Sequence, residues 1–168
     1  MKNILISIRP QYVAKILNKE KTIEVRKRFP SDYVGWVYIY CCKQRKNEIG
    51  CHINYEKVDG KVVARFWCDK VEEIKPQFTK DNKGVSYITE TKSYIELCNE
   101  SRLLSYKLNN YLLSKNGYAI HITKLEIFDK PKEIREFETR HWNSKNSFER
   151  DNVYQLTRAP QSWCYIEV

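Results

Sequence analysis

Long apolar runs are absent from this 168-residue sequence. A membrane-spanning helix needs about 20 mostly apolar residues, and no stretch here approaches that length. The first apolar stretch, Ile4 to Ile8, is followed at once by Arg9 and Pro10. It therefore indicates a first β-strand rather than a signal peptide. We expect a cytoplasmic protein without membrane contact.

Glycine and proline are also scarce, with five residues of each, and there are no internal repeats or low-complexity tracts. No segment has the composition of a flexible linker. Hydrophobic residues make up 42% and charged residues 30% of the chain, which is an ordinary globular composition. We predict one domain over residues 1–168, with a helical insertion at about 76–116.

The sequence lacks the common signatures of nucleotide-binding and hydrolytic enzymes. It has no Walker motif, no GxGxxG, no HExxH and no nucleophile elbow. Six cysteines are present but none forms a CxxC pair. Cys41 and Cys42 are adjacent on a predicted strand, so their side chains point to opposite faces and do not favour a shared metal ion. We predict free thiols, no metal and no cofactor.

Positive charge is the most prominent property of the chain. The formal net charge is +9, and residues 1–28 hold eight basic against two acidic side chains. A local excess of this kind favours a polyanionic partner such as nucleic acid. The alternative is a basic surface that serves only solubility.

Hydrophobic periodicity predicts an α+β protein. Ser93 and Glu96 form a capping box at the start of a long predicted helix, 93–115, which ends near Gly117. The remaining expected elements are a helix at 10–17 and strands at 4–8, 22–28, 36–41, 61–74, 118–128 and 163–168. The segment 61–74 is either one long strand or a bent pair of strands. The elements do not alternate as βαβα, which favours a mixed or mostly antiparallel sheet. Closure into a small barrel with flanking helices would leave no open strand edges.

A short segment concentrates charged residues. Glu24 and Arg26 lie two apart on a predicted strand and share a face, and Lys21 lies at the turn before them. Two cations can bind a phosphate or polarise a carbonyl, and one carboxylate can accept from a base or move a proton. The alternative is a surface salt-bridge set that contributes little to stability.

This segment resembles the signature of the ASCH family, which reads glycine, any residue, lysine, two residues, glutamate, any residue, arginine. Lys21, Glu24 and Arg26 match it, whereas Lys19 stands where the family usually has glycine. The flanks 4–17, 118–131 and 160–163 are also similar to ASCH proteins. The ending Pro160-Gln161-Ser162-Trp163 is most similar to members from phages and prophages.

The resemblance implies a PUA-like barrel that binds RNA or a modified base or nucleoside in a basic cleft. One ASCH branch hydrolyses the amide of an acetylated cytidine with a lysine, a threonine and a glutamate. Lys21 matches that lysine, but Glu24 occupies the threonine position. Other members are described as ribonucleases. A third alternative is a phage or prophage module that binds a host protein.

The candidate site follows from the motif and its charged flanks. Lys21 and Glu24 are the candidate catalytic residues. The candidate residues for binding nucleic acid or ligand are Arg9, Lys21, Glu24, Arg26, Arg28 and Trp163. Trp163 would stack on a base, although a core tryptophan is an equally ordinary interpretation. His121 would line the cleft or serve as a structural histidine. The sequence predicts no oligomeric state.

Overall fold

The computed structural model describes residues 2–43, 58–81, 83–140 and 153–168. The chain divides into two compact units, each built from separate stretches of sequence. Unit 1 comprises Met1–Ala14, Gly35–Phe66 and Leu125–Val168, and unit 2 comprises Lys15–Val34 and Trp67–Lys124. The single domain inferred from sequence stays a prediction.

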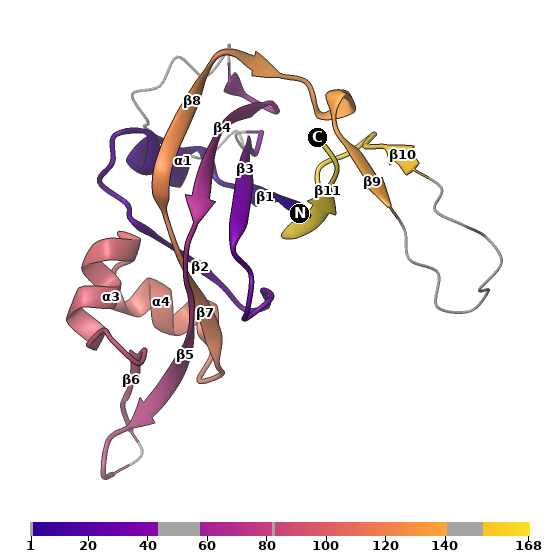
Figure 1. Cartoon of the computed structure of the whole chain (residues 1–168). Coiled ribbons are helices and arrows are strands. Elements are labelled where there is room, and N and C mark those ends of the chain that lie inside the picture. Colours follow the sequence, from indigo (N-terminus) through magenta and orange to yellow (C-terminus); the bar gives the residue numbers. More distant parts are fainter. Residues whose placement is uncertain (1, 44–57, 82, 141–152) are drawn as a thin grey trace, which may run out of the picture. The chain divides into compact units, whose positions relative to one another are not determined.

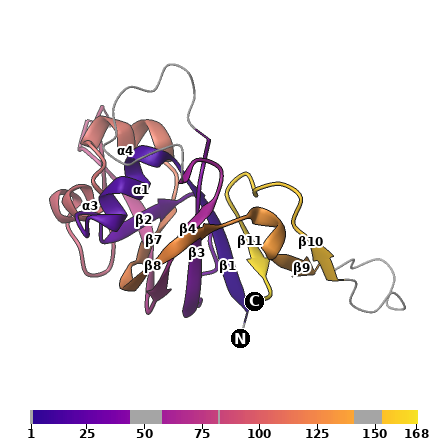
Figure 2. The same ribbon diagram turned by 90° about the horizontal axis from the view of Figure 1, so that it is seen from above.

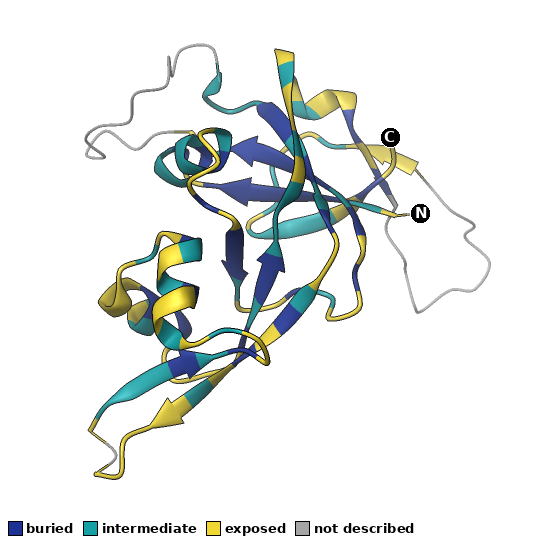
Figure 3. Cartoon of the chain, turned by 60° about the vertical axis from the view of Figure 1, so that its left-hand side comes forward, coloured by how far each residue is buried: buried dark blue, intermediate teal, exposed yellow. Residues whose placement is uncertain are grey.

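A five-stranded sheet in the order β11-β1-β3-β4-β8 forms the centre of unit 1 (Figure 1). The strands are β1 Asn3–Ile8, β3 Gly35–Cys41, β4 Val62–Cys68, β8 Thr123–Lys132 and β11 Trp163–Ile166. β1 pairs parallel with β3 and antiparallel with β11, so the sheet is mixed. β1 and β3 are buried almost throughout (Figure 3), as expected for apolar strands with both faces covered. The predicted α+β class with a mixed sheet is confirmed.

One face of this sheet carries an aromatic core cluster. Its buried members are Leu5, Tyr38, Tyr40, Val62, Phe137 and Ile166. Phe137 follows the short 3-10 helix η1 Ile134–Glu136 and is 1% exposed. The next strand, β9 Glu138–Arg140, pairs with β10 Val153–Gln155 and contacts β11, as Figure 2 shows. Tyr38 and Tyr40 are therefore core residues of the sheet rather than an open base-stacking surface.

Helix α1 spans Pro10–Leu17, as the sequence predicts. Pro10 occupies the first helical position, where its missing N–H leaves no donor unpaired. The carbonyl of Arg9 accepts from the backbone N–H groups of Tyr12 and Val13, so Arg9 is the residue that caps the helix start. Val13 and Ile16 are fully buried, which explains why this short helix is stable in its place.

Unit 2 contains a four-stranded antiparallel sheet in the order β2-β7-β5-β6. The strands are β2 Ile23–Arg26, β5 Val71–Phe78, β6 Val85–Ile88 and β7 Gly117–His121. Its core cluster contains Ile23, Val25, Ile74, Tyr87, Leu97, Leu108, Leu112 and Ala119. Ile23 and Val25 alternate with Glu24 and Arg26 along β2, so the strand contributes apolar side chains to the core and charged ones to the opposite face.

The single long helix predicted at 93–115 is wrong. Two helices form instead, α3 Tyr94–Ser101 and α4 Ser105–Leu112 (Figure 1). The chain turns because Arg102 adopts a left-handed conformation with φ 54°, which lets Leu97 and Leu108 both reach one core. Leu104, which directly precedes α4, is 60% exposed. The predicted capping box between Ser93 and Glu96 is confirmed.

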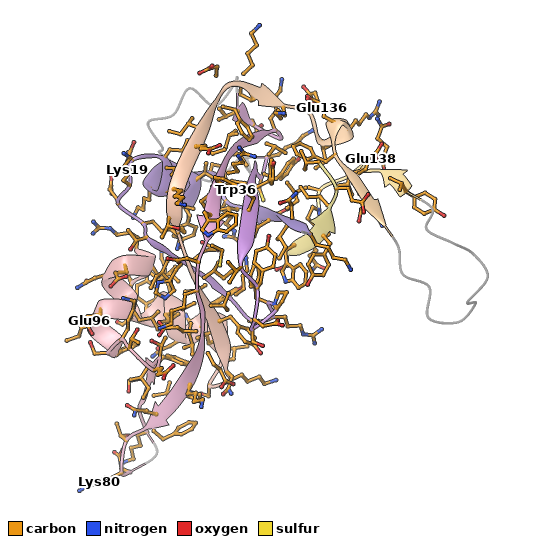
Figure 4. The ribbon with its side chains drawn as sticks, in the orientation of Figure 1. Lys19, Trp36, Lys80, Glu96, Glu136 and Glu138 are labelled. Carbon is orange, nitrogen blue, oxygen red and sulfur yellow. The ribbon has the colours of Figure 1, made fainter. Side chains whose placement is uncertain are left out.

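Two further expectations differ from the structure. The predicted strand 118–128 is two strands, β7 and β8, which belong to different sheets. The helical insertion expected at about 76–116 also contains β6 and the end of β5, which form an antiparallel hairpin whose exposed tip carries Lys80 (Figure 4). His141 and Trp142 lie outside the described residues. Across the described ranges, no helix is long and apolar enough to cross a membrane.

Candidate functional site

The turn after α1 brings the charged motif into position. The N–H of Lys19 donates to the carbonyl of Ile16 at 2.8 Å, and the N–H of Glu20 donates to that of Lys15 at 2.8 Å. This pair of bonds is a Schellman motif, which requires a left-handed residue at the position of Lys19. Lys19 adopts φ 59° accordingly, and it is labelled at this turn in Figure 4. The turn explains why the ASCH signature usually has glycine there.

Lys21 follows this turn and is buried. Its side chain is 1% exposed. The Nζ donates to the carbonyl oxygen of Ser101 at 2.6 Å and lies 3.1 Å from Oε2 of Glu24. Because Ser101 is the last residue of α3, the ammonium group lies where the helix dipole is negative. The Lys21 ammonium group thus donates a hydrogen bond to the C-terminal end of α3 and also forms an ion pair with Glu24.

Glu24 connects the two cations of the motif. Its Oε1 lies 3.2 Å from an Nη atom of Arg26, while its Oε2 faces Lys21. The side chains of Glu24 and Arg26 are 8% and 13% exposed. The structure therefore brings Lys21, Glu24 and Arg26 together, as their spacing predicts, but as a mostly buried network rather than an exposed salt-bridge set.

Burial also changes the chemistry of Lys21. Removal from water lowers the pKa of the Lys21 ammonium group, while the carboxylate of Glu24 acts in the opposite direction. The positive charge of Arg26 adds a smaller lowering of the same pKa. A lysine with a lowered pKa can lose its proton more readily than an exposed one, which gives it access to general-base or nucleophilic roles.

Exposed cations flank this buried network in unit 2. Lys19 precedes the network and is exposed, and Lys27 and Arg28 follow β2 and are exposed. The Nζ of Lys27 lies 5.2 Å from the ring centre of Tyr111. Arg102 is exposed as well, and its Nε donates to the carbonyl of Glu20 at 2.8 Å. Positive side chains thus lie at both ends of β2.

The remaining candidates, Arg9 and Trp163, belong to unit 1. Arg9 is exposed at the start of α1. Trp163 is half-buried on β11, opposite Ile6, with its ring 5.4 Å from that of Tyr165 in an edge-to-face contact. Arg9 and Trp163 therefore belong to a different unit from the Lys21 network.

Glu72 on β5 is a second buried carboxylate, which the sequence analysis did not identify. Its Oε1 accepts from Lys70 and Thr91, both at 2.7 Å, and its Oε2 lies 3.2 Å from the hydroxyl of Thr89 and 3.0 Å from Nε2 of His121. Burial alone would raise the pKa of Glu72, but these hydrogen bonds outweigh it and hold the pKa at about 2. His121 is therefore the partner of a buried carboxylate.

Thiols and carboxylates offer no metal site in the described ranges. The structure shows no disulfide bond at any of the described cysteines, which are Cys41, Cys42, Cys68, Cys98 and Cys164. Burial raises the pKa of the Cys68 thiol to about 12 and that of Cys164 to about 11. Thiols with raised pKa values are poor nucleophiles. Among described residues, no group of three or more potential metal ligands occurs.

The structure of this chain is similar to solved structures of known proteins. No family model and no curated protein sequence matches the chain. The crystal structure of ASCH from Zymomonas mobilis is similar, with a TM-score of 0.59 at 15% sequence identity over 99% of this chain and 88% of that chain. A serine-to-alanine variant of the same protein gives a TM-score of 0.56 at 13% identity, covering 99% and 89%.

Similarity at this level of identity establishes the fold. The resemblance inferred from Lys21, Glu24 and Arg26 points to the same group of proteins. The chain has the α+β, PUA-like fold of ASCH proteins.

Proposed function

We propose that the protein binds RNA, or a modified nucleoside or base, through the charged segment of unit 2. The observation that carries this proposal is the arrangement around β2. A buried network of Lys21, Glu24 and Arg26 fixes the strand, and exposed Lys27 and Arg28 follow directly after it. Exposed lysine and arginine side chains on a rigid segment supply the electrostatic part of nucleic-acid affinity.

The buried and exposed residues have different roles in this proposal. Lys27 and Arg28, with Lys19 before the network, contact phosphate groups. Arg26 is only 13% exposed, so little of its side chain is open to a ligand. Lys21 and Glu24 hold Arg26 and the strand in place, and they line the site if a base enters beside them.

Arg9 and Trp163 are proposed as further contacts made by unit 1. Arg9 is exposed and supplies one more cation for a phosphate. Trp163 is half-buried, so part of its ring is open for stacking on a base. Their contribution is tested separately from that of the β2 segment, with Arg9→Gln and Trp163→Ala.

The direct experiment is a binding assay with single-stranded RNA, single-stranded DNA and a panel of modified nucleosides. The test variant is Lys27→Ala/Arg28→Ala. Lys80→Ala/Lys83→Ala is the matched control, because it removes the same charge from exposed positions elsewhere in unit 2. RNA affinity should fall in the first variant and be nearly unchanged in the second. Equal affinities in both variants would reject the assignment and favour a protein partner instead.

The lowered pKa of Lys21 supports a second candidate function, hydrolysis of a nucleoside amide or of RNA. In the amide reaction, water would attack the carbonyl carbon with Lys21 or Glu24 taking its proton. The C–N bond would break and the departing amine would receive a proton. Incubation with acetylated cytidine and with labelled RNA, followed by mass spectrometry, tests this. Product that disappears in Glu24→Gln supports it, and no product from the wild type rejects it.

A further inference from the structure

Four side chains from three neighbouring strands of unit 1 form a cluster that the charged motif does not involve. Trp36 and Tyr38 lie on β3, Arg65 lies on β4 and Glu126 lies on β8. These strands are adjacent in the sheet order. Figure 4 labels Trp36 on β3, in the middle of this sheet. We call these four residues the Arg65 cluster.

The guanidinium group of Arg65 is the centre of the cluster. Its Cζ lies 4.1 Å from the ring centre of Trp36 and 5.8 Å from that of Tyr38. Its Nε donates to Oε2 of Glu126 at 2.6 Å, and an Nη atom donates to the hydroxyl of Tyr38 at 3.0 Å. The side chain of Arg65 is nevertheless 31% exposed. The guanidinium lies over an aromatic ring, and the Arg65 side chain still reaches the surface.

The cluster keeps hydrogen-bonding capacity that the described part of the chain does not use. The Tyr38 hydroxyl accepts from Arg65 but donates to no described residue, although Tyr38 is only 3% exposed. Glu126 uses Oε2 for Arg65, and among described residues nothing donates to its Oε1. A buried hydroxyl proton without an acceptor is unfavourable. The cluster therefore presents a donor and an acceptor beside a flat cation.

Charge argues against a bare anion as the occupant. The Glu126 carboxylate balances the Arg65 cation, and its hydrogen bond raises the pKa of Arg65. Phosphate would approach a pair with no net charge and would meet the carboxylate directly. A flat, uncharged ring with both donors and acceptors on its edge suits the site better. Arginine planes and aromatic rings stack on unpaired nucleobases, whose edges carry that mixture of groups.

We propose that the Arg65 cluster is a binding site for an unpaired nucleobase. The base stacks on the exposed side of the Arg65 guanidinium, which Trp36 supports from beneath. Its edge accepts from the Tyr38 hydroxyl and donates to Oε1 of Glu126. This inference deepens the proposed binding of RNA or a nucleoside, but it rests on unit 1 alone and uses none of the β2 cations.

The test uses free nucleosides, so that phosphate contacts play no part. The protein has four tryptophans, whose indole N–H signals can be resolved by NMR and assigned with single Trp→Phe variants. Uridine and cytidine should shift the Trp36 signal in a saturable way, and ribose 5-phosphate should not. 3-Methyluridine, which lacks the ring donor for Glu126, should bind several-fold more weakly than uridine.

Two variants separate the binding role from a structural one. Tyr38→Phe removes only the hydroxyl and keeps the ring packed against Phe128 and Phe137, 6.1 and 5.5 Å away between centroids. Arg65→Lys keeps the charge but removes the stacking plane. Each should weaken nucleoside binding by about fivefold or more, the lower end of the range for base stacking. Tyr106→Phe on exposed α4 is the control and should leave binding unchanged.

The outcomes distinguish this inference from the proposed function. If no nucleoside shifts the Trp36 indole signal, the inference is overturned, even if RNA still binds through Lys27 and Arg28. A shift caused equally by ribose 5-phosphate also overturns it, because the site would then be an anion site. Nucleoside binding at Trp36 with unchanged RNA affinity in Lys27→Ala/Arg28→Ala would sustain the inference and reject the β2 assignment.

Discussion

The Nζ of Lys21 donates to the carbonyl of Ser101 at 2.6 Å, joining two residues that are 80 positions apart in the sequence. Backbone contacts reinforce this link, since the N–H of Thr22 donates to the carbonyl of Glu100 at 3.0 Å. The segment that carries the motif is therefore attached to the C-terminal end of α3. Lys21 therefore has a structural role, which is to connect this segment to α3, and that role can be tested separately from any contact with a ligand.

Replacing Lys21 with methionine should lower the free energy of unfolding by about 3 kcal/mol. The change leaves Glu24 buried without one of its two cations and the end of α3 without its donor, and breaking a buried ion pair typically costs that much. Urea unfolding followed by circular dichroism measures the effect. Lys107→Met, at an exposed position of α4, should change stability by less than about 0.5 kcal/mol. Equal effects of the two substitutions would show that the Lys21 contacts contribute nothing.

Lys19→Gly should stabilise the protein by about 1 kcal/mol. Lys19 has φ 59°, a conformation that costs a residue with a side chain about 1 kcal/mol more than glycine. The same substitution within α4, Lys107→Gly, should destabilise by about 1 kcal/mol, because glycine is a poor helix former. Thermal unfolding of both variants checks the opposite signs. Destabilisation by Lys19→Gly would contradict the left-handed turn.

The lowered pKa of Glu72 should make the folded protein less stable in acid. The pKa of Glu72 is held at about 2 in the folded protein, below the ordinary value of 4.5. Its contribution, about 3 kcal/mol, is present above pH 4.5 and declines as the pH falls toward 2, because the unfolded chain binds the proton first. Unfolding free energies measured between pH 7 and pH 2.5 should fall more steeply in the wild type than in Glu72→Gln. Parallel curves would refute this role.

Sequence reasoning found the features that depend on local spacing. The alternation in β2 correctly placed Glu24 and Arg26 on one face, and the capping box correctly placed the start of α3. The family resemblance even marked Lys19 as unusual, and its positive φ gives the physical reason. Each of these depends on residues within a few positions of one another.

Features that depend on distant contacts could not be predicted. The break between α3 and α4 at Arg102 follows from the need to bury Leu97 and Leu108 in one core, and no proline or glycine marks it. The burial of Lys21 depends on Ser101. The Arg65 cluster joins strands that only the sheet order makes neighbours. In these three features the structure is determined by tertiary packing, which overrides the preference of the local sequence.

The salt dependence of RNA binding tests the central claim most directly. Affinity for one single-stranded RNA is measured across a range of salt concentrations for the wild type, Lys27→Ala/Arg28→Ala and Lys80→Ala/Lys83→Ala. If Lys27 and Arg28 neutralise phosphates, the slope of log K against log salt should become shallower by about 1.4 in their variant, about 0.7 for each lost contact with a single strand. The control should keep the wild-type slope. A wild-type slope in Lys27→Ala/Arg28→Ala, or a wild type that binds no RNA, would contradict the claim.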